Sequence, residues 1–365
     1  MPDTAAPAAP PFPPSILATA APAIPAARAW AAAYRGAAGP PIDLTQAVPG
    51  YPPHPDLLAR LGAEAARLAN AGYGAIEGEE SLRAALAADL AGRYGAAFAA
   101  EDIVITAGCN LAFVMAMTAL VGPGAAVLLP APWYFNHQMA LTMQGIETVP
   151  LPCRAEDGFV PDPGRAAALI GERVRAVVLV TPNNPTGAIY PPEVIAAFAA
   201  LCRRRRIALV LDETYRDSKS YCVPGHRVGA IVAGPAIRAQ LCKVLDTLQI
   251  CAPRAAQAAL AWAVPALAAW REGNRDVMAA RAVAFRRAFA ALPGWRIDAL
   301  GAYFAYLRLP EDAPDAVATA ARLAAERGLM TLPGPFFGPG QERHLRLAFA
   351  NADEATIARV PARLG

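Results

Sequence analysis

A short apolar run, residues 207–211, ends in an acid and is followed by a dense set of reactive side chains. The run has the length and the continuous hydrophobicity of a buried strand. Asp212 closes it, and Tyr215, Lys219 and Arg227 follow within the next 15 residues. In open α/β sheets, ligands lie beyond the carboxyl ends of the strands. The segment therefore predicts a ligand pocket at the end of a sheet strand.

Other apolar runs predict more strands on both sides of this one. Residues 175–181 have the uninterrupted hydrophobic core that parallel strands usually show, and they lead into the turn PNNPTG at 182–187. Further strands are expected at four places with shorter apolar runs, namely 102–106, 127–130, 145–150 and 228–234. Residues 239–256 and 258–292 are expected to be largely helical, with breaks near Pro253 and Pro265.

Three of the turns and strands carry side chains suited to an anionic, aromatic ligand. Gly108 and Cys109 open an apolar helix, where exposed amides attract a phosphate, although many α/β proteins have such a turn. Trp133 and Tyr134 follow a strand, and adjacent rings suit stacking on a flat heterocycle as well as ordinary core packing. Arg346 lies within the last strand and offers a planar fork for a carboxylate, or for a surface ion pair.

In their order along the chain, these segments resemble those of the pyridoxal-phosphate-dependent aminotransferases of class I/II, which have fold type I. The resemblance covers roughly residues 40–352 and depends most on PNNPTG and on the eight-residue spacing from Lys219 to Arg227. It implies an α/β fold, with a mostly parallel sheet between helices on both faces and a smaller α+β C-terminal domain. The implied domains are a disordered N-terminal arm with part of the small domain (1–45), a large cofactor-binding domain (46–270) and the small domain (271–365).

The resemblance also implies a role for each candidate residue around the pyridine ring. Lys219 would form the Schiff base with pyridoxal 5′-phosphate and then move the proton as general base and acid. Asp212 would hold the ring nitrogen charged, and Tyr215 and Asn184 would hydrogen-bond the ring oxygen. Tyr134 is the ring expected over the pyridine, with Trp133 as the alternative.

The remaining candidates belong to the cofactor phosphate and to the substrate. The resemblance implies a phosphate site made by five residues, namely Gly108, Cys109, Ser218, Arg227 and Tyr73 of the neighbouring subunit. Arg346, together with Asn184, would bind the α-carboxylate of the substrate. The implied activity moves an amino group between an L-amino acid and a 2-oxo acid, in a homodimer with two-fold symmetry.

One feature departs from the family pattern. Only six residues separate Asp212 from Lys219, where the family has several times as many, including a further strand that ends in Ser-x-Ser-Lys. Arg216 stands in place of the first of those serines. The short spacing indicates that a segment of a few tens of residues is missing. Because a parallel strand needs a crossover of about a dozen residues, no such strand fits here. Strand 228–234 should then pair directly with the Asp212 strand or be separated from it by a gap.

The short spacing still leaves Lys219 within reach of a cofactor ring. Seven residues in extended conformation span ~23 Å at ~3.3 Å each. Aminotransferase activity is the first hypothesis. The alternatives are a catalytically impaired protein of the same fold, or another fold type I enzyme such as a carbon–sulfur lyase.

Composition excludes several other classes of protein. The net charge is only +3, and the one basic run, residues 203–206, fits a solvated helix end better than a nucleic-acid footprint. The longest stretch without an acid, Lys or Arg, residues 103–146, is interrupted by Gly122-Pro123-Gly124, so no membrane span is expected. The six cysteines have no metal-binding spacing, which is typical of reduced thiols in a cytoplasmic protein.

Overall fold

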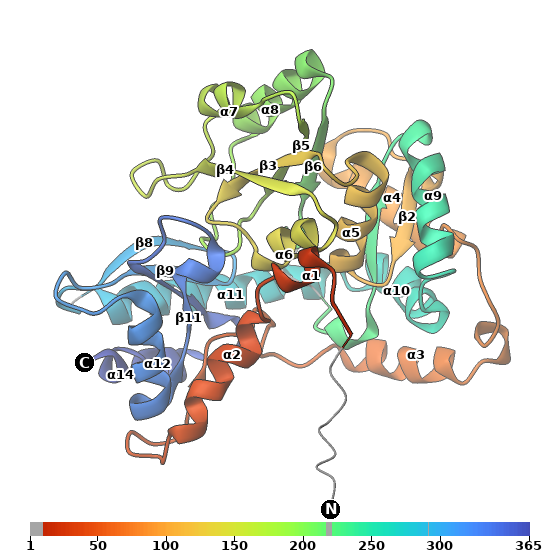
Figure 1. Ribbon diagram of the computed structural model, residues 1–365. Coiled ribbons are helices and arrows are strands. Elements are labelled where there is room, and N and C mark those ends of the chain that lie inside the picture. The colour runs from red at the N-terminus through yellow and green to blue at the C-terminus, as the bar shows by residue number, and fades with distance from the viewer. Residues whose placement is uncertain (1–9, 217–220, 291) are drawn as a thin grey trace, which may run out of the picture.

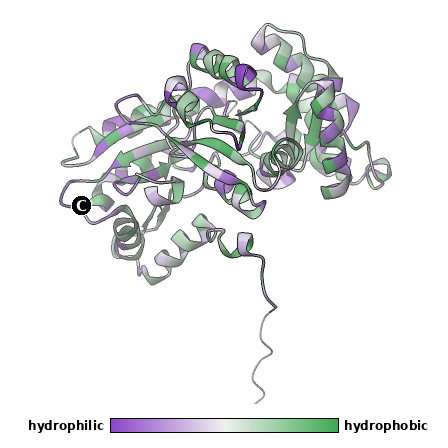
Figure 2. Ribbon diagram, turned by 45° about the horizontal axis from the view of Figure 1, so that its top comes forward, coloured by the Kyte–Doolittle hydropathy of each residue, from purple (hydrophilic) through white to green (hydrophobic). Residues whose placement is uncertain are grey.

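The computed structural model describes residues 10–216, 221–290 and 292–365 of the chain. Their strands form two separate sheets in the middle of the chain, a third sheet in the C-terminal part and one short two-stranded pairing (Figure 1). The strands are coloured mostly as hydrophobic, and hydrophilic residues gather on the helices and loops around them (Figure 2). In the described part of the chain, no helix combines the length and the apolar character needed to cross a bilayer.

The larger central sheet is four-stranded and parallel. Its strands, in spatial order, are β4 (Glu147–Pro152), β3 (Ala126–Ala131), β5 (Val174–Val180) and β6 (Ala208–Asp212). Every residue of β3 and all but one of β5 are buried, which explains their uninterrupted apolar sequences. The strands expected from these runs are confirmed.

Helices cover both faces of this sheet. On one face, α5 (Cys109–Leu120) and α6 (Phe135–Met143) pack on alternate residues of β3 and β5. On the other, α7 (Pro163–Leu169) and α8 (Pro192–Arg205) pack on the residues between them. The basic run ends α8 as predicted, with Arg206 in the left-handed conformation that follows the helix.

The smaller central sheet pairs β2 (Ile103–Thr106) with β7 (Gly229–Val232) in antiparallel orientation. One of its faces packs on α5 and α9 (Pro235–Leu248). The other face packs on a group of three helices, namely α3 (Pro55–Ala65), α4 (Glu80–Tyr94) and α10 (Arg254–Ala266). Helix α5 therefore contributes to the cores of both central sheets.

The two central sheets are not joined by a strand ladder among the described residues. Within the described ranges, β6 pairs only with β5, and β7 pairs only with β2. Leu211 of β6 and Val232 of β7 are 40% and 45% exposed, whereas β2 and β3 are buried along their whole length. Of the two outcomes expected for strand 228–234, separation from the Asp212 strand is confirmed and direct pairing is wrong.

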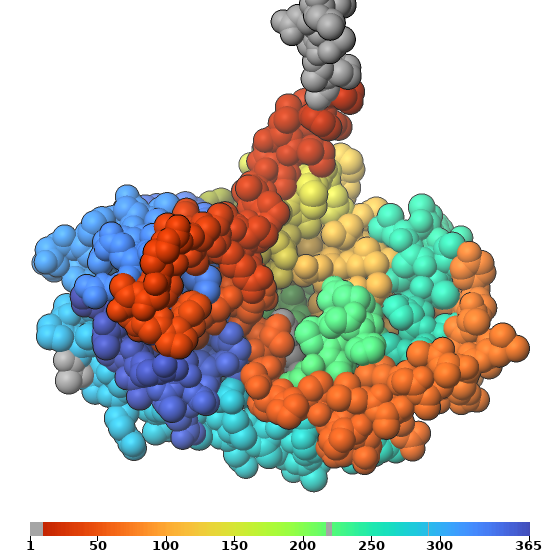
Figure 3. Space-filling view, turned by 90° about the horizontal axis from the view of Figure 1, so that it is seen from below, coloured from red at the N-terminus to blue at the C-terminus, as the bar shows by residue number. Residues whose placement is uncertain are grey.

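The C-terminal part is built on an antiparallel sheet. Its strands, in order, are β11 (Leu332–Pro333), β12 (His344–Ala348), β9 (Phe304–Arg308) and β8 (Arg296–Gly301). Four helices belong to this part of the molecule, namely α11 (Ala268–Phe289), α12 (Ala316–Arg327), α13 (Glu354–Arg359) and α14 (Pro361–Leu364). Seen from below, it lies opposite the helices that surround the smaller central sheet (Figure 3).

The N-terminal segment packs mainly on the C-terminal part. Helix α2 (Ala23–Trp30) contacts α12, and β1 (Ile42–Asp43) pairs in parallel with β10 (Leu329–Met330). Before them, α1 (Pro14–Leu17) contacts α6 of the larger central sheet. The described N-terminal residues therefore span both halves of the molecule.

Candidate active site

Several candidate side chains meet at the carboxyl ends of the larger central sheet. Asp212 ends β6, Asn184 lies in the turn after β5, and Tyr134 lies in the turn after β3. Because parallel strands end at the same edge, these turns converge, as the sequence predicted.

Asp212 is held by a histidine that the sequence analysis did not single out. His137, one turn into α6, places Nε2 3.1 Å from Asp212 Oδ2, and the backbone N–H of Thr214 donates to Oδ1 at 2.9 Å. The imidazole is buried and stacks on Phe113, with ring centres 3.9 Å apart. Burial alone would raise the pKa of Asp212, but the hydrogen bonds from His137 and Thr214 outweigh it and lower that pKa. Asp212 is therefore a carboxylate at neutral pH.

A chain of hydrogen bonds connects Tyr215, Asn184 and Arg346. The Asn184 amide donates to the Tyr215 hydroxyl at 3.0 Å, and Arg346 Nη1 donates to Asn184 Oδ1 at 3.2 Å. Burial raises the pKa of Tyr215 well above its ordinary value, so its phenol stays protonated. The chain thus runs from the segment after β6 to the last strand of the C-terminal sheet.

The two asparagines of PNNPTG have different tasks. Asn183 Oδ1 accepts hydrogen bonds from the Thr186 hydroxyl at 2.9 Å and from the Thr186 backbone N–H at 3.2 Å. The backbone N–H of Gly187 donates to the Asn183 carbonyl at 2.7 Å. Asn183 therefore holds the turn together, and this leaves the Asn184 side chain to face Tyr215 and Arg346.

Arg346 is a buried cation rather than a surface residue. It is 1% exposed, its guanidinium lies 5.2 and 5.3 Å from the ring centres of Phe304 and Phe337, and it also donates to the Thr45 carbonyl. Burial lowers the pKa of Arg346 to about 10, which still leaves it charged at neutral pH. Its Nε is buried and has no hydrogen-bond acceptor among the described residues.

Tyr134, not Trp133, turns toward Asp212. The Tyr134 hydroxyl accepts a hydrogen bond from Asn136 at 2.8 Å and lies 3.4 Å from Asn110 Oδ1 at the start of α5. Its ring meets His137 edge to face, with centres 5.2 Å apart. Trp133 instead packs toward the C-terminal part, where its backbone N–H donates to the Phe337 carbonyl at 2.8 Å. The geometry therefore favours Tyr134 for stacking on a ligand.

A second group of candidates meets at the start of α5, beside the smaller central sheet. Gly108 precedes the helix with φ +94°, and a Cβ there would overlap the Arg227 guanidinium. A Cβ on Gly229 of β7 would lie 2.8 Å from the backbone nitrogen of Cys109. Arg227 and the first amides of α5 are thus neighbours, as an anion site requires.

Three candidates are not brought into this site by the described chain. Tyr73 is 80% exposed, so its side chain lies mostly in solvent in the single chain. Ser218 and Lys219 lie outside the described residues.

Sequence reasoning missed His137, Asn110 and Asn136, although Asn110 adjoins Cys109 and the other two lie within three residues of Tyr134. The available signal was the helical spacing from Tyr134 to His137 and the need of a buried Asp212 for a donor.

Comparisons with known proteins identify the family of the chain. The chain matches the family described as aminotransferase class I and II over residues 40–217 and 218–364. It is 30% identical to an arginine–pyruvate transaminase of Pseudomonas aeruginosa, over 76% of this chain and 78% of that protein. It is 28% identical to a valine–pyruvate aminotransferase of Mycobacterium tuberculosis, over 81% of this chain and 83% of that protein.

The solved structure of a Thermus thermophilus aspartate aminotransferase with maleate is similar to the whole fold. The TM-score is 0.89 at 25% identity, with 97% of this chain and 99% of that chain covered. A family match over most of the chain, the similarity to this structure and the convergent side chains at the strand ends lead to one conclusion. The chain belongs to the class I and II aminotransferases.

Proposed function

We propose that this aminotransferase binds its cofactor with Asp212, Tyr215, Asn184 and Arg227 and its substrate carboxylate with Arg346. Class I and II aminotransferases use pyridoxal 5′-phosphate, which supplies an electron sink for removal of the substrate Cα proton. The substrates are an amino acid and a 2-oxo acid.

The residues present fit the cofactor at its ring. Asp212 is a carboxylate that suits a protonated pyridine nitrogen, and its orientation is fixed by His137. Tyr215 and Asn184 each carry a donor for the ring oxygen, and Tyr134 offers an aromatic face.

The residues present also fit the cofactor at its phosphate. Cys109 opens α5, and the Arg227 guanidinium lies beside Gly108, whose own backbone N–H donates to the Thr106 carbonyl at 2.8 Å. A helix start and a guanidinium are both favourable for a phosphate dianion.

The observation that carries the substrate assignment is the buried Nε of Arg346, which has no acceptor in the part of the chain that the structure describes. A buried guanidinium donor without an acceptor costs free energy, and a substrate carboxylate would remove that cost. The link from Arg346 through Asn184 to Tyr215 would place this carboxylate next to the ring oxygen of the cofactor.

The catalytic amine is proposed from the sequence. Lys219 follows Asp212 by seven residues and would bind the cofactor aldehyde, then move the proton at the substrate Cα. Ser218 would add a hydroxyl at the phosphate.

The described residues do not select among amino acid side chains, because the rings of Phe304 and Phe337 that flank Arg346 are themselves fully buried. Two of the relatives have pyruvate in their names, so pyruvate is the proposed amino acceptor.

We further propose a cytoplasmic homodimer with domains at 1–45, 46–270 and 271–365. The exposed Tyr73 would reach the phosphate site of the partner subunit. We also propose, from the short spacing of Asp212 and Lys219 in the sequence, that a segment is missing before Lys219.

A transamination assay tests the proposal. Purified protein with pyridoxal 5′-phosphate is given neutral, aromatic and acidic L-amino acids, with pyruvate as acceptor, and alanine is measured. Arg346→Lys should raise KM for the amino acid by about tenfold or more, because a charge-assisted hydrogen bond is lost. Arg343→Lys, three residues away and bound to backbone carbonyls, is the control. Cofactor binding without alanine formation from any donor would contradict the proposal.

A further inference from the structure

We propose that Tyr94, Glu213 and Arg216 form a latch that fixes the two central sheets in the relative position needed to bind both ends of one ligand. Tyr94 is a positioning residue in this account, because it acts through the segment that carries Asp212 and Tyr215. The inference rests on the proposed function, since it takes the ligand to be the cofactor.

The proposed cofactor site is divided between the two central sheets. Asp212 and Asn184 follow strands of the larger sheet, whereas Arg227 and Gly229 adjoin β7 of the smaller one. No ladder of backbone hydrogen bonds connects β6 to β7 in the described chain. The spacing between the ring half and the phosphate half therefore depends on α5 and on side-chain contacts.

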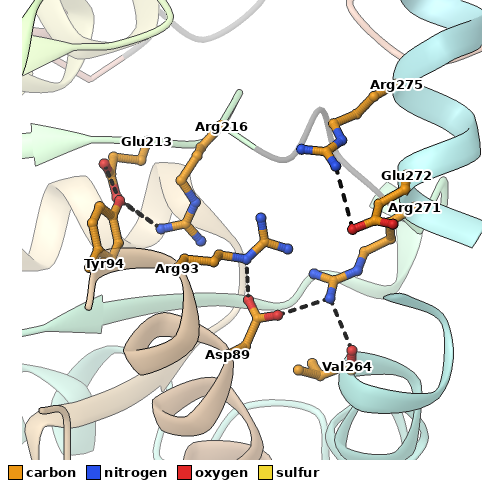
Figure 4. Close-up of polar contacts among 9 residues, drawn as sticks. All are labelled: Asp89, Arg93, Tyr94, Glu213, Arg216, Val264, Arg271, Glu272 and Arg275. Atoms are coloured by element: carbon orange, nitrogen blue, oxygen red, sulfur yellow. Dashed lines mark hydrogen bonds and ion pairs between the residues drawn. The ribbon is translucent and has the colours of Figure 1, made fainter. Parts of the chain in front are cut away.

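The latch crosses this division. The Tyr94 hydroxyl lies 2.5 and 2.6 Å from the two carboxylate oxygens of Glu213, and Arg216 Nη1 lies 2.9 Å from that hydroxyl (Figure 4). Arg216 Nη1 also lies 3.1 Å from Glu213 Oε2, and its guanidinium lies 5.4 Å from the Tyr94 ring centre. Glu213 directly follows Asp212, and Arg216 directly follows Tyr215.

The other end of the latch is anchored to the smaller sheet and its helices. Tyr94 is the last residue of α4, which packs on β2 and α10. One turn earlier, Asp89 accepts hydrogen bonds from Arg93 at 2.8 Å and from Arg271 of α11 at 2.9 Å (Figure 4). Arg271 also donates to the Val264 carbonyl at 3.1 Å. The last turn of α4 is therefore a fixed point against which the segment after β6 is held.

This arrangement predicts which ligands depend on the latch. A ligand that contacts only one sheet does not depend on how the two sheets are placed relative to each other. A ligand that contacts both must offset the entropy of ordering them, and a latch that orders them beforehand strengthens its binding. Loss of the latch should therefore weaken only the ligand that spans both halves.

Three probes separate these cases. Pyridoxine 5′-phosphate contacts both halves and has no aldehyde, so binding does not involve Lys219. Pyridoxine contacts the ring half, and inorganic phosphate contacts the phosphate half. Dissociation constants are measured for the full chain and for Tyr94→Phe. Tyr34→Phe is the control. It also removes a tyrosine hydroxyl, which donates to the Gly39 carbonyl at 2.7 Å, but it does so in the N-terminal segment that packs on the C-terminal part.

In Tyr94→Phe, the affinity for pyridoxine 5′-phosphate should fall about three- to tenfold, the range of one net hydrogen bond. The affinities for pyridoxine and for phosphate should not change, and Tyr34→Phe should bind all three like the wild type. Equal weakening of all three probes in Tyr94→Phe would show general damage and overturn the proposal. No weakening of any probe would overturn it as well.

Hydrogen exchange of the ligand-free protein tests the latch independently of the cofactor. Residues 208–216 should exchange faster in Tyr94→Phe and in Glu213→Gln than in the wild type or Tyr34→Phe. Unchanged exchange would refute the latch. Failure of the wild type to bind pyridoxine 5′-phosphate would instead refute the proposed function.

Discussion

The close approach of two glycines gives a sharp test of how the C-terminal sheet meets the PNNPTG turn. Gly187 ends this turn with φ +75°. A Cβ at Gly187 would lie 2.5 Å from the carbonyl carbon and 2.6 Å from the backbone nitrogen of Gly301, at the end of β8. These are backbone atoms, so no side-chain rotation can relieve the overlap. Gly187→Ala should therefore force the turn and β8 apart.

The expected loss of stability has two parts. Placing alanine in the left-handed region costs about 1–2 kcal/mol. Forcing an extra methyl group into a packed contact costs a further 1–3 kcal/mol or so. The free energy of unfolding should fall by about 2–5 kcal/mol in Gly187→Ala.

Gly124→Ala is the matched control. Gly124 has φ +78°, close to that of Gly187, and no heavy atom lies within 4 Å of its Cβ position. This variant should lose only the first part, about 1–2 kcal/mol. The difference between the two variants therefore measures the close approach alone.

Urea unfolding, followed by circular dichroism and extrapolated linearly, gives both values. Because Asn184 lies in the same turn, Gly187→Ala should also lower kcat/KM under conditions where it is still folded. Equal losses of stability in the two variants would refute the contact between the turn and β8.

Two further predictions follow from buried charges. Burial alone would raise the pKa of Asp298, but hydrogen bonds from His344 and from Arg296 and Arg308 outweigh it and lower that pKa. Asp298→Asn should lower the free energy of unfolding by about 1–2 kcal/mol at neutral pH, with screening at the exposed arginines included. This difference in the free energy of unfolding should shrink only as the pH falls below about 4, the ordinary pKa of aspartate. A difference that stays constant down to about pH 2 would contradict this. His137→Phe keeps an aromatic ring stacked on Phe113 but removes the donor to Asp212. The variant should bind pyridoxine 5′-phosphate about tenfold or more weakly. Unchanged binding in a titration would show that His137 does not support the site.

The parts of the site that the sequence predicted are those that follow apolar runs. Asp212 ends β6, and Asn184 lies in the turn after β5, whose continuous apolar sequence is readable because its residues are almost all buried. Arg227 was predicted from its spacing to Lys219 and Gly108 from the turn between a strand and an apolar helix, and the structure brings them together. In these cases the local pattern and the topology point to the same place.

Other features depend on packing that no local pattern carries. His137 reaches Asp212 only because α6 lies across the end of β6, which is distant in sequence. The burial of Arg346 arises from rings of β9 and of the loop after β11, so the strand pattern alone left a surface ion pair open. The separation of β6 from β7 was one of two expected outcomes, and the pairing of β7 with β2 decided between them.

A site divided between two sheets is expected to complete amino transfer. The half-reaction tests this, in which the protein loaded with pyridoxal 5′-phosphate is mixed with an L-amino acid and no acceptor. We expect loss of the visible absorbance band of the bound cofactor and release of stoichiometric 2-oxo acid, with neither change in Lys219→Ala. A protein that holds the cofactor but releases no 2-oxo acid from any amino acid would contradict it.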